Sequence, residues 1–159
     1  MRRAREDGEM EFRVVAYDSA VAGELIEEVQ QEYVVRYGGR DGSLVDPAEF
    51  APPQGLFLIG YDDGAAVACG GWRGHSTDAE IKRMYVRKAA RGRGHARAML
   101  AELERTALAA GFDRMILETG SKQPEAVALY RSAGYTDSPP FGHYAHAPLA
   151  VHLGKPLRP

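Results

Sequence analysis

This chain of 159 residues is long enough to form one domain with its own hydrophobic core and short for two domains. Hydrophobic residues make up 45% and charged residues 26% of the sequence, as in soluble globular proteins. The formal net charge of -2 excludes a general attraction to nucleic acid or to acidic membranes, so any phosphate binding has to be local.

The N-terminal residues 1–10 contain several arginines but no apolar stretch behind them, so they do not resemble a secretory signal. We expect these residues to form a solvated lead-in to a single domain of residues 11–159. No apolar run is long enough to span a bilayer, and the only cysteine, Cys69, cannot form an internal disulfide. These features predict a cytoplasmic protein without a membrane partner.

The first half of the chain predicts a strand, a helix and a three-stranded meander. Asp18 or Ser19 can cap the helix, and Gly38 ends it. Its apolar stripe has the helical spacing and consists of Ala22, Leu25, Ile26, Val29 and Tyr33. The predicted strands cover residues 12–17, 56–61, 65–73 and 79–86. Residues 39–55 predict a long loop with a short helical turn, and loops of this length are often functional.

The second half of the chain predicts helices that alternate with strands. A helix begins near Gly94 and stops at Gly111, and a strand follows at residues 114–119. Pro124 suits the first position of the next helix, which ends at Gly134. A strand at 149–153 is expected to close the sheet. This order predicts a mixed α+β fold, in which helices flank one mostly antiparallel, twisted sheet.

The segment from Tyr85 to Leu100 carries the strongest functional signal. It reads YVRKAARGRGHARAML, so arginines and glycines alternate where a strand passes into a helix. Glycine lets backbone N–H groups approach a ligand closely, and the helix start adds unpaired N–H donors and partial positive charge. The arginines add donors suited to phosphate oxygens. Neither a Walker loop nor a dinucleotide fingerprint is present, so the pattern predicts another kind of pyrophosphate site.

The motif RGRGHA at residues 91–96 resembles the [RQ]-x-x-G-x-[GA] signature of the GCN5-related N-acetyltransferases. The resemblance extends from Phe12 to Leu153 and includes the order of elements and the later ALYRSAGY segment. It implies an acetyl-CoA co-substrate and no metal. In that family, loop amides bind the pyrophosphate, and the preceding strand pairs with the pantetheine arm. The residues expected to bind the cofactor here are Met84, Tyr85, Val86, Arg91, Gly92, Arg93, Gly94, His95, Ala96 and Gln123.

The resemblance also implies two catalytic residues. Acyl transfer to an amine needs the free amine, so a base has to take its proton, and a proton donor helps the leaving thiolate. Glu80 is expected to be the base, and Tyr130, in the AVALY segment, is expected to be the acid. Either residue can instead be structural, Glu80 as an ion-pair partner of Lys82 or Arg83 and Tyr130 in the core. The family commonly has Asn seven residues before that Tyr, where this chain has Gln123.

Several other side chains leave alternatives open. His143, in the FGHY segment, competes with Glu80 for the role of base and is also a candidate structural histidine. Trp72, Tyr33 and Tyr37 either line the acceptor pocket or pack in the core. The remaining histidines show no metal-ligand spacing, and Cys69 is expected in the core.

The resulting prediction is an N-acetyltransferase in which an amine attacks acetyl-CoA directly within a ternary complex. The acceptor is a primary amine on a small molecule, a peptide N-terminus or a lysine, and the sequence does not choose between them. The alternatives are an N-acyltransferase that uses another acyl-CoA and a CoA-binding sensor without turnover. Homodimers are common in the family, and no nucleic-acid partner is expected.

Overall fold

The computed structural model describes residues 9–158, and the first eight residues of the expected lead-in lie outside this range. The strands are β1 (Glu11–Val14), β2 (Gly55–Asp62), β3 (Ala65–His75), β4 (Asp78–Val86), β5 (Arg114–Gly120), β6 (Thr136–Asp137) and β7 (Ala150–Pro156). The helices are α1 (Ala20–Tyr37), α2 (His95–Ala109) and α3 (Pro124–Ser132), with 3-10 turns at Pro47–Phe50 and Lys88–Ala90.

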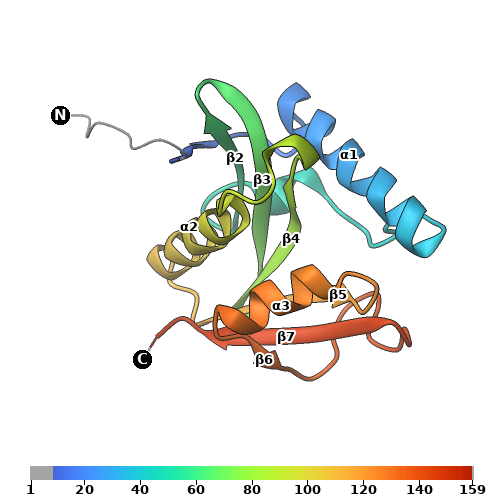
Figure 1. Cartoon of the computed structure of the whole chain (residues 1–159). Coiled ribbons are helices and arrows are strands. Elements are labelled where there is room, and N and C mark those ends of the chain that lie inside the picture. Colours follow the sequence, from blue (N-terminus) through green and yellow to red (C-terminus); the bar gives the residue numbers. More distant parts are fainter. Residues whose placement is uncertain (1–8, 159) are drawn as a thin grey trace.

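All seven strands belong to one sheet with the order β1-β2-β3-β4-β5-β7-β6. Only the β4–β5 pair is parallel, and the other neighbours are antiparallel. Figure 1 shows the three helices arranged around this twisted sheet. The predicted α+β fold with a mostly antiparallel sheet is therefore confirmed.

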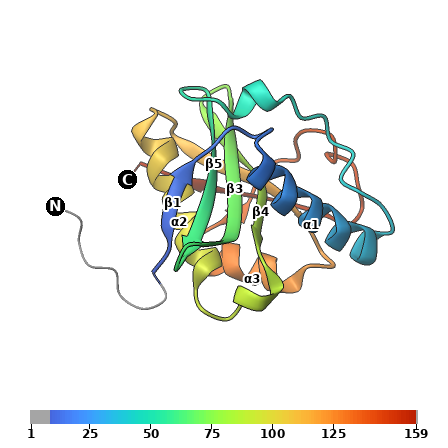
Figure 2. The same cartoon turned by 90° about the horizontal axis from the view of Figure 1, so that it is seen from above.

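Helices α1 and α2 pack on opposite faces of β2 and β3 (Figure 2). Successive residues of a strand point to opposite faces, so Phe57 and Ile59 pack with the α1 side, and Leu56 and Leu58 with the α2 side. The apolar stripe of α1 meets its face through Ala22, Leu25 and Val29, all of them buried. The sheet thus has one hydrophobic layer on each side.

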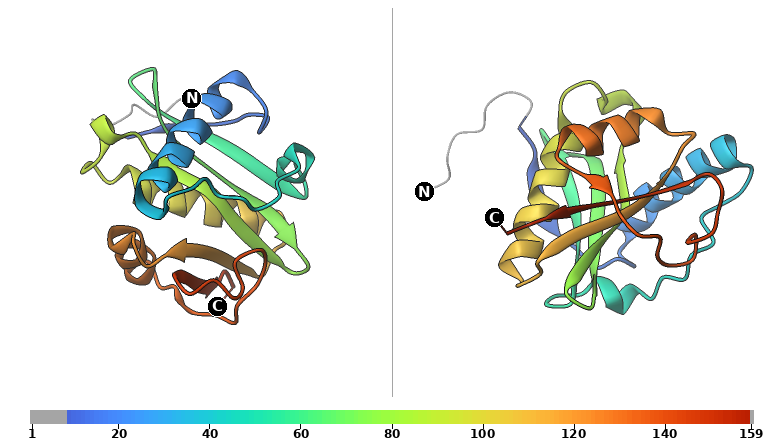
Figure 3. Two further views of the ribbon diagram at one scale, coloured as in Figure 1. Left: turned by 90° about the vertical axis from the view of Figure 1, so that its right-hand side faces the viewer. Right: turned by 90° about the horizontal axis from the view of Figure 1, so that it is seen from below.

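The sheet divides between β4 and β5. The two strands pair only over Asp78–Glu80 and Arg114–Ile116, although both continue for several residues beyond. Figures 1 and 3 show the strands meeting at one end and diverging toward the side where α1 lies. An opening between neighbouring strands leaves backbone groups that no ladder satisfies, which makes it a natural place for a ligand.

A few predicted boundaries move in the structure. β1 ends at Val14, because the chain turns after Val15 and the Ser19 N–H donates to the Ala16 carbonyl. Ser19 occupies the N-cap of α1, but its side chain makes no capping hydrogen bond. β7 extends to Pro156, and the short strand β6 was not predicted. Met10, at the end of the expected lead-in, packs in the core and is 6% exposed.

Candidate active site

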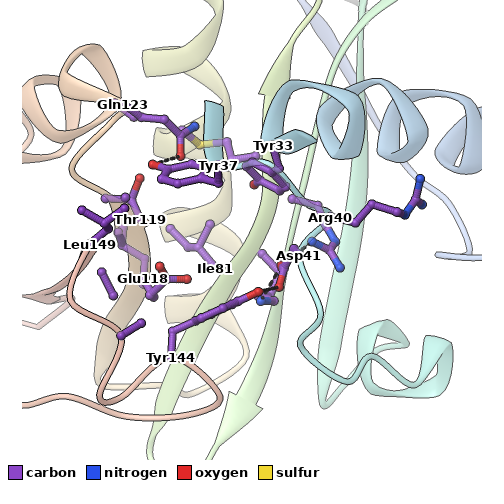
Figure 4. A pocket seen from close by; sticks show the side chains of 18 of the residues that line it. Tyr33, Tyr37, Arg40, Asp41, Ile81, Glu118, Thr119, Gln123, Tyr144 and Leu149 are labelled. Carbon is purple, nitrogen blue, oxygen red and sulfur yellow. Dashed lines mark hydrogen bonds and ion pairs between the residues drawn. The ribbon is translucent and has the colours of Figure 1, made fainter. Parts of the chain in front are cut away.

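A cavity of about 310 Å³ lies in the opening between β4 and β5. Its lining comes from five parts of the chain: the end of α1, the loop after it, the diverging strands, α3, and the loop before β7. Figure 4 shows the side chains from these elements converging on one space. The divergence of the strands therefore creates a cavity around which residues distant in sequence meet.

Glu118 on β5 is the carboxyl group that faces this cavity (Figure 4). Burial raises its pKa to about 7, and the negative charges of Asp41 and Glu80 add to this effect, while Lys82 opposes it. A carboxyl with this pKa exchanges protons near neutral pH, which is the property that a general base requires. Sequence reasoning missed Glu118.

The other ionised groups in the cavity form a cluster around Asp41. The Asp41 Oδ2 accepts hydrogen bonds from Arg83 Nη1 at 2.5 Å and from Lys82 Nζ at 3.3 Å. Burial alone would raise the pKa of Asp41, but both cations and two hydrogen bonds from Ser43 hold it well below its ordinary value. Asp41 therefore remains ionised, and it does not compete with Glu118 as a base.

Tyr130 belongs both to the core and to the cavity. Its ring packs edge-on against Tyr135 with the ring centres 5.7 Å apart, and the residue also lines the pocket. Burial and the nearby charge of Glu118 raise its pKa, so the hydroxyl keeps its proton at neutral pH. Tyr130 can therefore pack in the core and still border the cavity, so the two roles expected for it are compatible.

Glu80 lies beside the cavity but is not among the residues that line it. Its Oε1 accepts a hydrogen bond from Arg73 Nε at 3.0 Å, and its side chain is 13% exposed. Glu80 thus forms an ion pair, as in the structural alternative, but its partner is Arg73 and not Lys82 or Arg83. Its charge still acts on the site, since it raises the pKa of Glu118.

Gln123 stands at the N-cap of α3 and lines the cavity. Its side-chain oxygen accepts a hydrogen bond from the Tyr37 hydroxyl at 3.2 Å, which links α3 to the end of α1 (Figure 4). A β-carbon built on Gly120 would lie 1.7 Å from the same hydroxyl. Gly120 is therefore needed for Tyr37 to reach Gln123.

The expected pyrophosphate loop has the backbone that its role requires. Gly92 and Gly94 adopt φ of +80° and +81°, and a β-carbon on either would meet no described atom within 4 Å. Gly94 caps α2 without a side-chain hydrogen bond, so the first N–H groups of the helix remain available. The backbone of this loop therefore fits a phosphate-bearing ligand.

Most side chains of this loop contact other parts of the protein, which the sequence did not indicate. Arg91 forms an ion pair with Glu32 on α1 and also donates from Nε to the Val86 carbonyl at 3.0 Å. His95 is 2% exposed and lies 3.2 Å from the Asp62 carboxylate. Arg93 is exposed and lies 3.7 Å from the Asp62 carboxylate, and Ala96 packs against the core. The loop thus offers amides and the charge of Arg93 rather than a row of free guanidinium groups.

The end of β4 borders the same opening. Met84 lines the cavity, whereas Tyr85 and Val86 are buried and pair with β3. On the other side of Met84 and its neighbours, β5 has already diverged. The edge of β4 that faces away from β3 is therefore accessible to an extended ligand at this point.

The aromatic residues that were expected either in the acceptor pocket or in the core are found in both places. Tyr33 and Tyr37 line the cavity. Trp72 is 2% exposed and donates from Nε1 to Thr106 at 3.0 Å, so it packs in the core, as does Cys69. His143 is exposed and lies edge-on to Tyr144 outside the cavity lining.

Some of the cavity residues that sequence reasoning missed had a detectable signal. In the strand RMILETG, Glu118 is the only carboxylate among apolar neighbours, and Lys82 and Arg83 occur together in the strand AEIKRMYV. Charged residues in strands whose other residues are buried usually have a partner or a function. Asp41 and Tyr144 carried no such signal, because both occur in loops of polar and small residues.

Comparisons with known proteins agree on the fold. An acyl-CoA N-acyltransferase, so described, from Klebsiella pneumoniae superposes with a TM-score of 0.79 at 29% identity, covering 96% of this chain and 100% of that chain. The PaiA N-acetyltransferase of Thermoplasma acidophilum, solved in complex with coenzyme A, gives a TM-score of 0.70 at 14% identity, covering 93% and 99% of the two chains. Both likenesses show that this chain has the same fold as these transferases.

Sequence comparisons identify the family. The model of the Acetyltransferase (GNAT) family matches residues 23–135. An IAA acetyltransferase of Azospirillum brasilense is 37% identical over 136 residues, which cover 84% of this chain and 89% of that protein. An uncharacterized N-acetyltransferase of Schizosaccharomyces pombe is 30% identical over 125 residues, covering 75% and 77%. The chain belongs to the GNAT acetyltransferase family.

The described residues also bear on metal binding and on membrane insertion. No group of three or more His, Cys, Asp or Glu side chains is arranged to hold a metal ion within residues 9–158. None of the helices in this range combines the length and the apolar composition needed to cross a bilayer.

Proposed function

We propose that this protein transfers an acetyl group from acetyl-CoA to a primary amine in a ternary complex. The observation that carries the proposal is the cavity between the diverging strands, where Glu118 and Tyr130 both border the space next to a loop suited to pyrophosphate. Membership of the GNAT family supports the same reaction.

The co-substrate would supply an acetyl thioester, and this chain's residues would hold it at three places. The N–H groups of residues 92–97, with Arg93 beside them, suit the pyrophosphate. The free edge of β4 at Met84 to Val86 suits the pantetheine arm. Gln123, held by Tyr37, lies where α3 meets the cavity and offers an amide to the same arm. Arg91 acts indirectly, because its ion pair with Glu32 secures the loop against α1.

We assign the base to Glu118 rather than to Glu80. Glu118 faces the cavity and has a pKa of about 7, whereas Glu80 is held by Arg73 at the cavity's margin. The Glu118 carboxylate takes a proton from the acceptor ammonium, and the free amine then forms the new N–C bond. As the C–S bond breaks, the Tyr130 hydroxyl gives its proton to the leaving sulfur, and the second proton that the new amide nitrogen loses restores the hydroxyl. We assign no role to His143, because it is exposed and does not line the cavity.

The test is a thiol-release assay with acetyl-CoA and a panel of small amines and lysine peptides. Release of free CoA together with an acetylated amine, identified by mass, supports the proposal. Saturable binding of acetyl-CoA without thiol release from any amine would instead make the protein a CoA-binding sensor. Release that requires a longer acyl thioester would identify an N-acyltransferase of other specificity.

A further inference from the structure

Two adjacent cations on β4 turn toward the same carboxylate. Lys82 and Arg83 both donate to Asp41 Oδ2, although neighbouring residues of a regular strand point to opposite faces. The local backbone explains this. Arg83 has φ of +60°, and the pairing of β4 with β3 shifts its register between Cys69 and Gly71. Such bulges redirect side chains and are common beside active sites.

A left-handed conformation is unfavourable for a long side chain such as arginine, so the surrounding structure has to maintain it. The bulge brings a second positive charge to the side of β4 that faces the cavity, where Lys82 and Arg83 both line the wall. The side chains of Lys82 and Arg83 are 9% and 4% exposed. This placement serves the cavity and not the packing of the sheet.

The cluster has more positive than negative charge. Asp41 is the only carboxylate of the described residues that contacts Lys82 or Arg83. Its oxygens also accept from Ser43 and from the Tyr144 hydroxyl, so they are fully engaged. Arg40, which also borders the cavity, is already paired with Glu27 at the surface. Buried charges are normally paired, and Glu118 across the cavity is neutral once it has taken the acceptor's proton, so one positive charge then remains for a ligand to balance.

The cavity is also restricted on its outer side. The Tyr144 hydroxyl donates to Asp41 at 2.9 Å and accepts from the Gly42 N–H at 2.9 Å. It thereby joins the loop before β7 to the loop after α1, as Figure 4 shows for the pair with Asp41. Tyr33, Ile81 and Leu149 contribute the neighbouring wall. A small acceptor fits this enclosure better than a folded protein chain.

We propose that the acceptor is a small amino acid-like molecule whose carboxylate lies next to its amine and whose remainder is apolar or aromatic. This inference rests on the proposed function. The carboxylate is bound by Lys82 and Arg83, which places the adjacent amine at Glu118 on the opposite strand. One carboxylate balances the single unpaired positive charge. A lysine side chain of a protein lacks a carboxylate near its amine and leaves the charge unbalanced.

The experiment compares acceptors that differ only in this carboxylate. Phenylalanine is tested against 2-phenylethylamine and phenylalaninamide, and methionine against 3-(methylthio)propylamine, with thiol release as the readout. We expect kcat/KM to be at least about tenfold higher for each amino acid, as is typical for a buried charge-assisted contact. The amide has the more acidic ammonium and therefore more free amine, so a preference for the acid cannot reflect amine availability.

Variants of Lys82 assign the preference to the cluster. Lys82→Met keeps an unbranched chain without charge. The ratio of kcat/KM for the amino acid to kcat/KM for the decarboxylated amine should then fall to within about threefold of one. Lys82→Arg keeps the charge and should restore the preference. Arg40→Gln removes the neighbouring cation that Glu27 already balances, and it should leave the ratio unchanged. Melting temperature and acetyl-CoA titration verify that each variant is folded and binds its co-substrate.

The outcomes separate this inference from the proposed function. Turnover of the decarboxylated amines at rates equal to or above those of the amino acids overturns the carboxylate preference and leaves the acetyltransferase intact. The same conclusion follows if only lysine peptides are acetylated, or if Lys82→Met retains the full ratio. Absence of thiol release with every amine overturns both proposals.

Discussion

The glycine loop at residues 91–96 and the Asp41 cluster differ in the groups that they offer to a charged ligand, backbone amides in the loop and side chains in the cluster. The loop would use its backbone. Gly92 and Gly94 have left-handed backbone angles, no side chain caps the first amides of α2, and Arg91 is paired with Glu32. The cluster uses side chains from β4 and from the loop after α1, which meet only because β4 bulges at Arg83. In the proposed function, a contiguous loop would hold the co-substrate, and residues distant in sequence would hold the acceptor.

This difference has a physical consequence. A loop that binds through its amides tolerates many side-chain substitutions. It does not tolerate a substitution that blocks the approach to the backbone or adds a negative charge. A cluster that binds through side chains tolerates little change in any of its members, because removing one leaves another buried charge without a partner. The variants below test where each rule holds, beginning with the largest expected effect.

Gly94→Asp should cause the largest loss. Asp enters the left-handed region readily and suits a helix start, so the fold should persist. Its carboxylate would repel the pyrophosphate and occupy the amides that bind it. Loss of two charge-assisted hydrogen bonds corresponds to about a thousandfold weaker binding of acetyl-CoA, measured by calorimetric titration. Gly111→Asp is the control, because Gly111 has φ of +97° and open space at the far end of α2. Unchanged affinity in Gly94→Asp would remove the loop from the site.

Glu118→Gln should lower turnover by several hundredfold, within the usual range of general-base catalysis, while acetyl-CoA still binds. The wild-type rate should rise with pH through about 7, because the carboxyl has to lose its proton to act. This limb should disappear from the pH–rate profile of the variant. Glu80→Gln is the matched control and should keep the limb. If Glu80→Gln loses it and Glu118→Gln does not, the base is Glu80.

The same variant carries a stability prediction of known sign. The folded pKa of Glu118, about 7, lies above its ordinary value of 4.5, so the unfolded chain loses this proton more easily. Wild-type stability should therefore fall as pH rises from 4.5 to about 7. Glu118→Gln removes this penalty and should melt at a higher temperature than the wild type at pH 8. Equal melting temperatures at pH 5 and pH 8 in the wild type would contradict the raised pKa.

The sequence predicted the loop far better than the cluster, for reasons visible in these residues. RGRGHA is contiguous, and the function proposed for it depends on backbone freedom and a helix start, both of which are local. The order of strands and helices was also predictable from periodicity, with errors at the ends of β1 and β7. The contact between Asp41 and Arg83 joins residues distant in sequence, and it depends on a bulge that no periodicity reveals. For the same reason Glu118 was missed and Glu80 was expected to be the base: only the divergence of β4 from β5 shows which carboxyl faces the cavity.

Tyr130→Phe tests a residue that belongs to both the core and the cavity. If its hydroxyl protonates the departing sulfur, turnover should fall by about a hundredfold. The ring contact with Tyr135 remains, so acetyl-CoA affinity and melting temperature should change little. A thioester with a more acidic thiol should reduce the effect. A clear loss of stability with nearly normal turnover would show that Tyr130 is a packing residue only.

Tyr37→Phe should have the smallest effect and addresses the junction of the two regions. Tyr37 ends α1 on the acceptor side, and its hydroxyl donates to Gln123 at the start of α3. Removing one uncharged hydrogen bond costs about 1 kcal/mol, or roughly fivefold in affinity. If Gln123 contacts the co-substrate, the loss should appear as weaker acetyl-CoA binding, with kcat changed by less than about twofold. Tyr61→Phe, on β2 and outside the cavity lining, is the control.

The alternative for Tyr37 has a different kinetic signature. If the hydroxyl acts on the acceptor side, acetyl-CoA affinity should stay normal while the KM of the amine rises. Gly120→Ala separates the two cases again, because its β-carbon would displace the Tyr37 hydroxyl from Gln123 without removing it. Weaker acetyl-CoA binding in both variants places the Tyr37–Gln123 pair on the co-substrate side. A rise in the amine KM in both, at constant acetyl-CoA affinity, would assign the pair to the acceptor and leave α3 without a cofactor contact from Gln123.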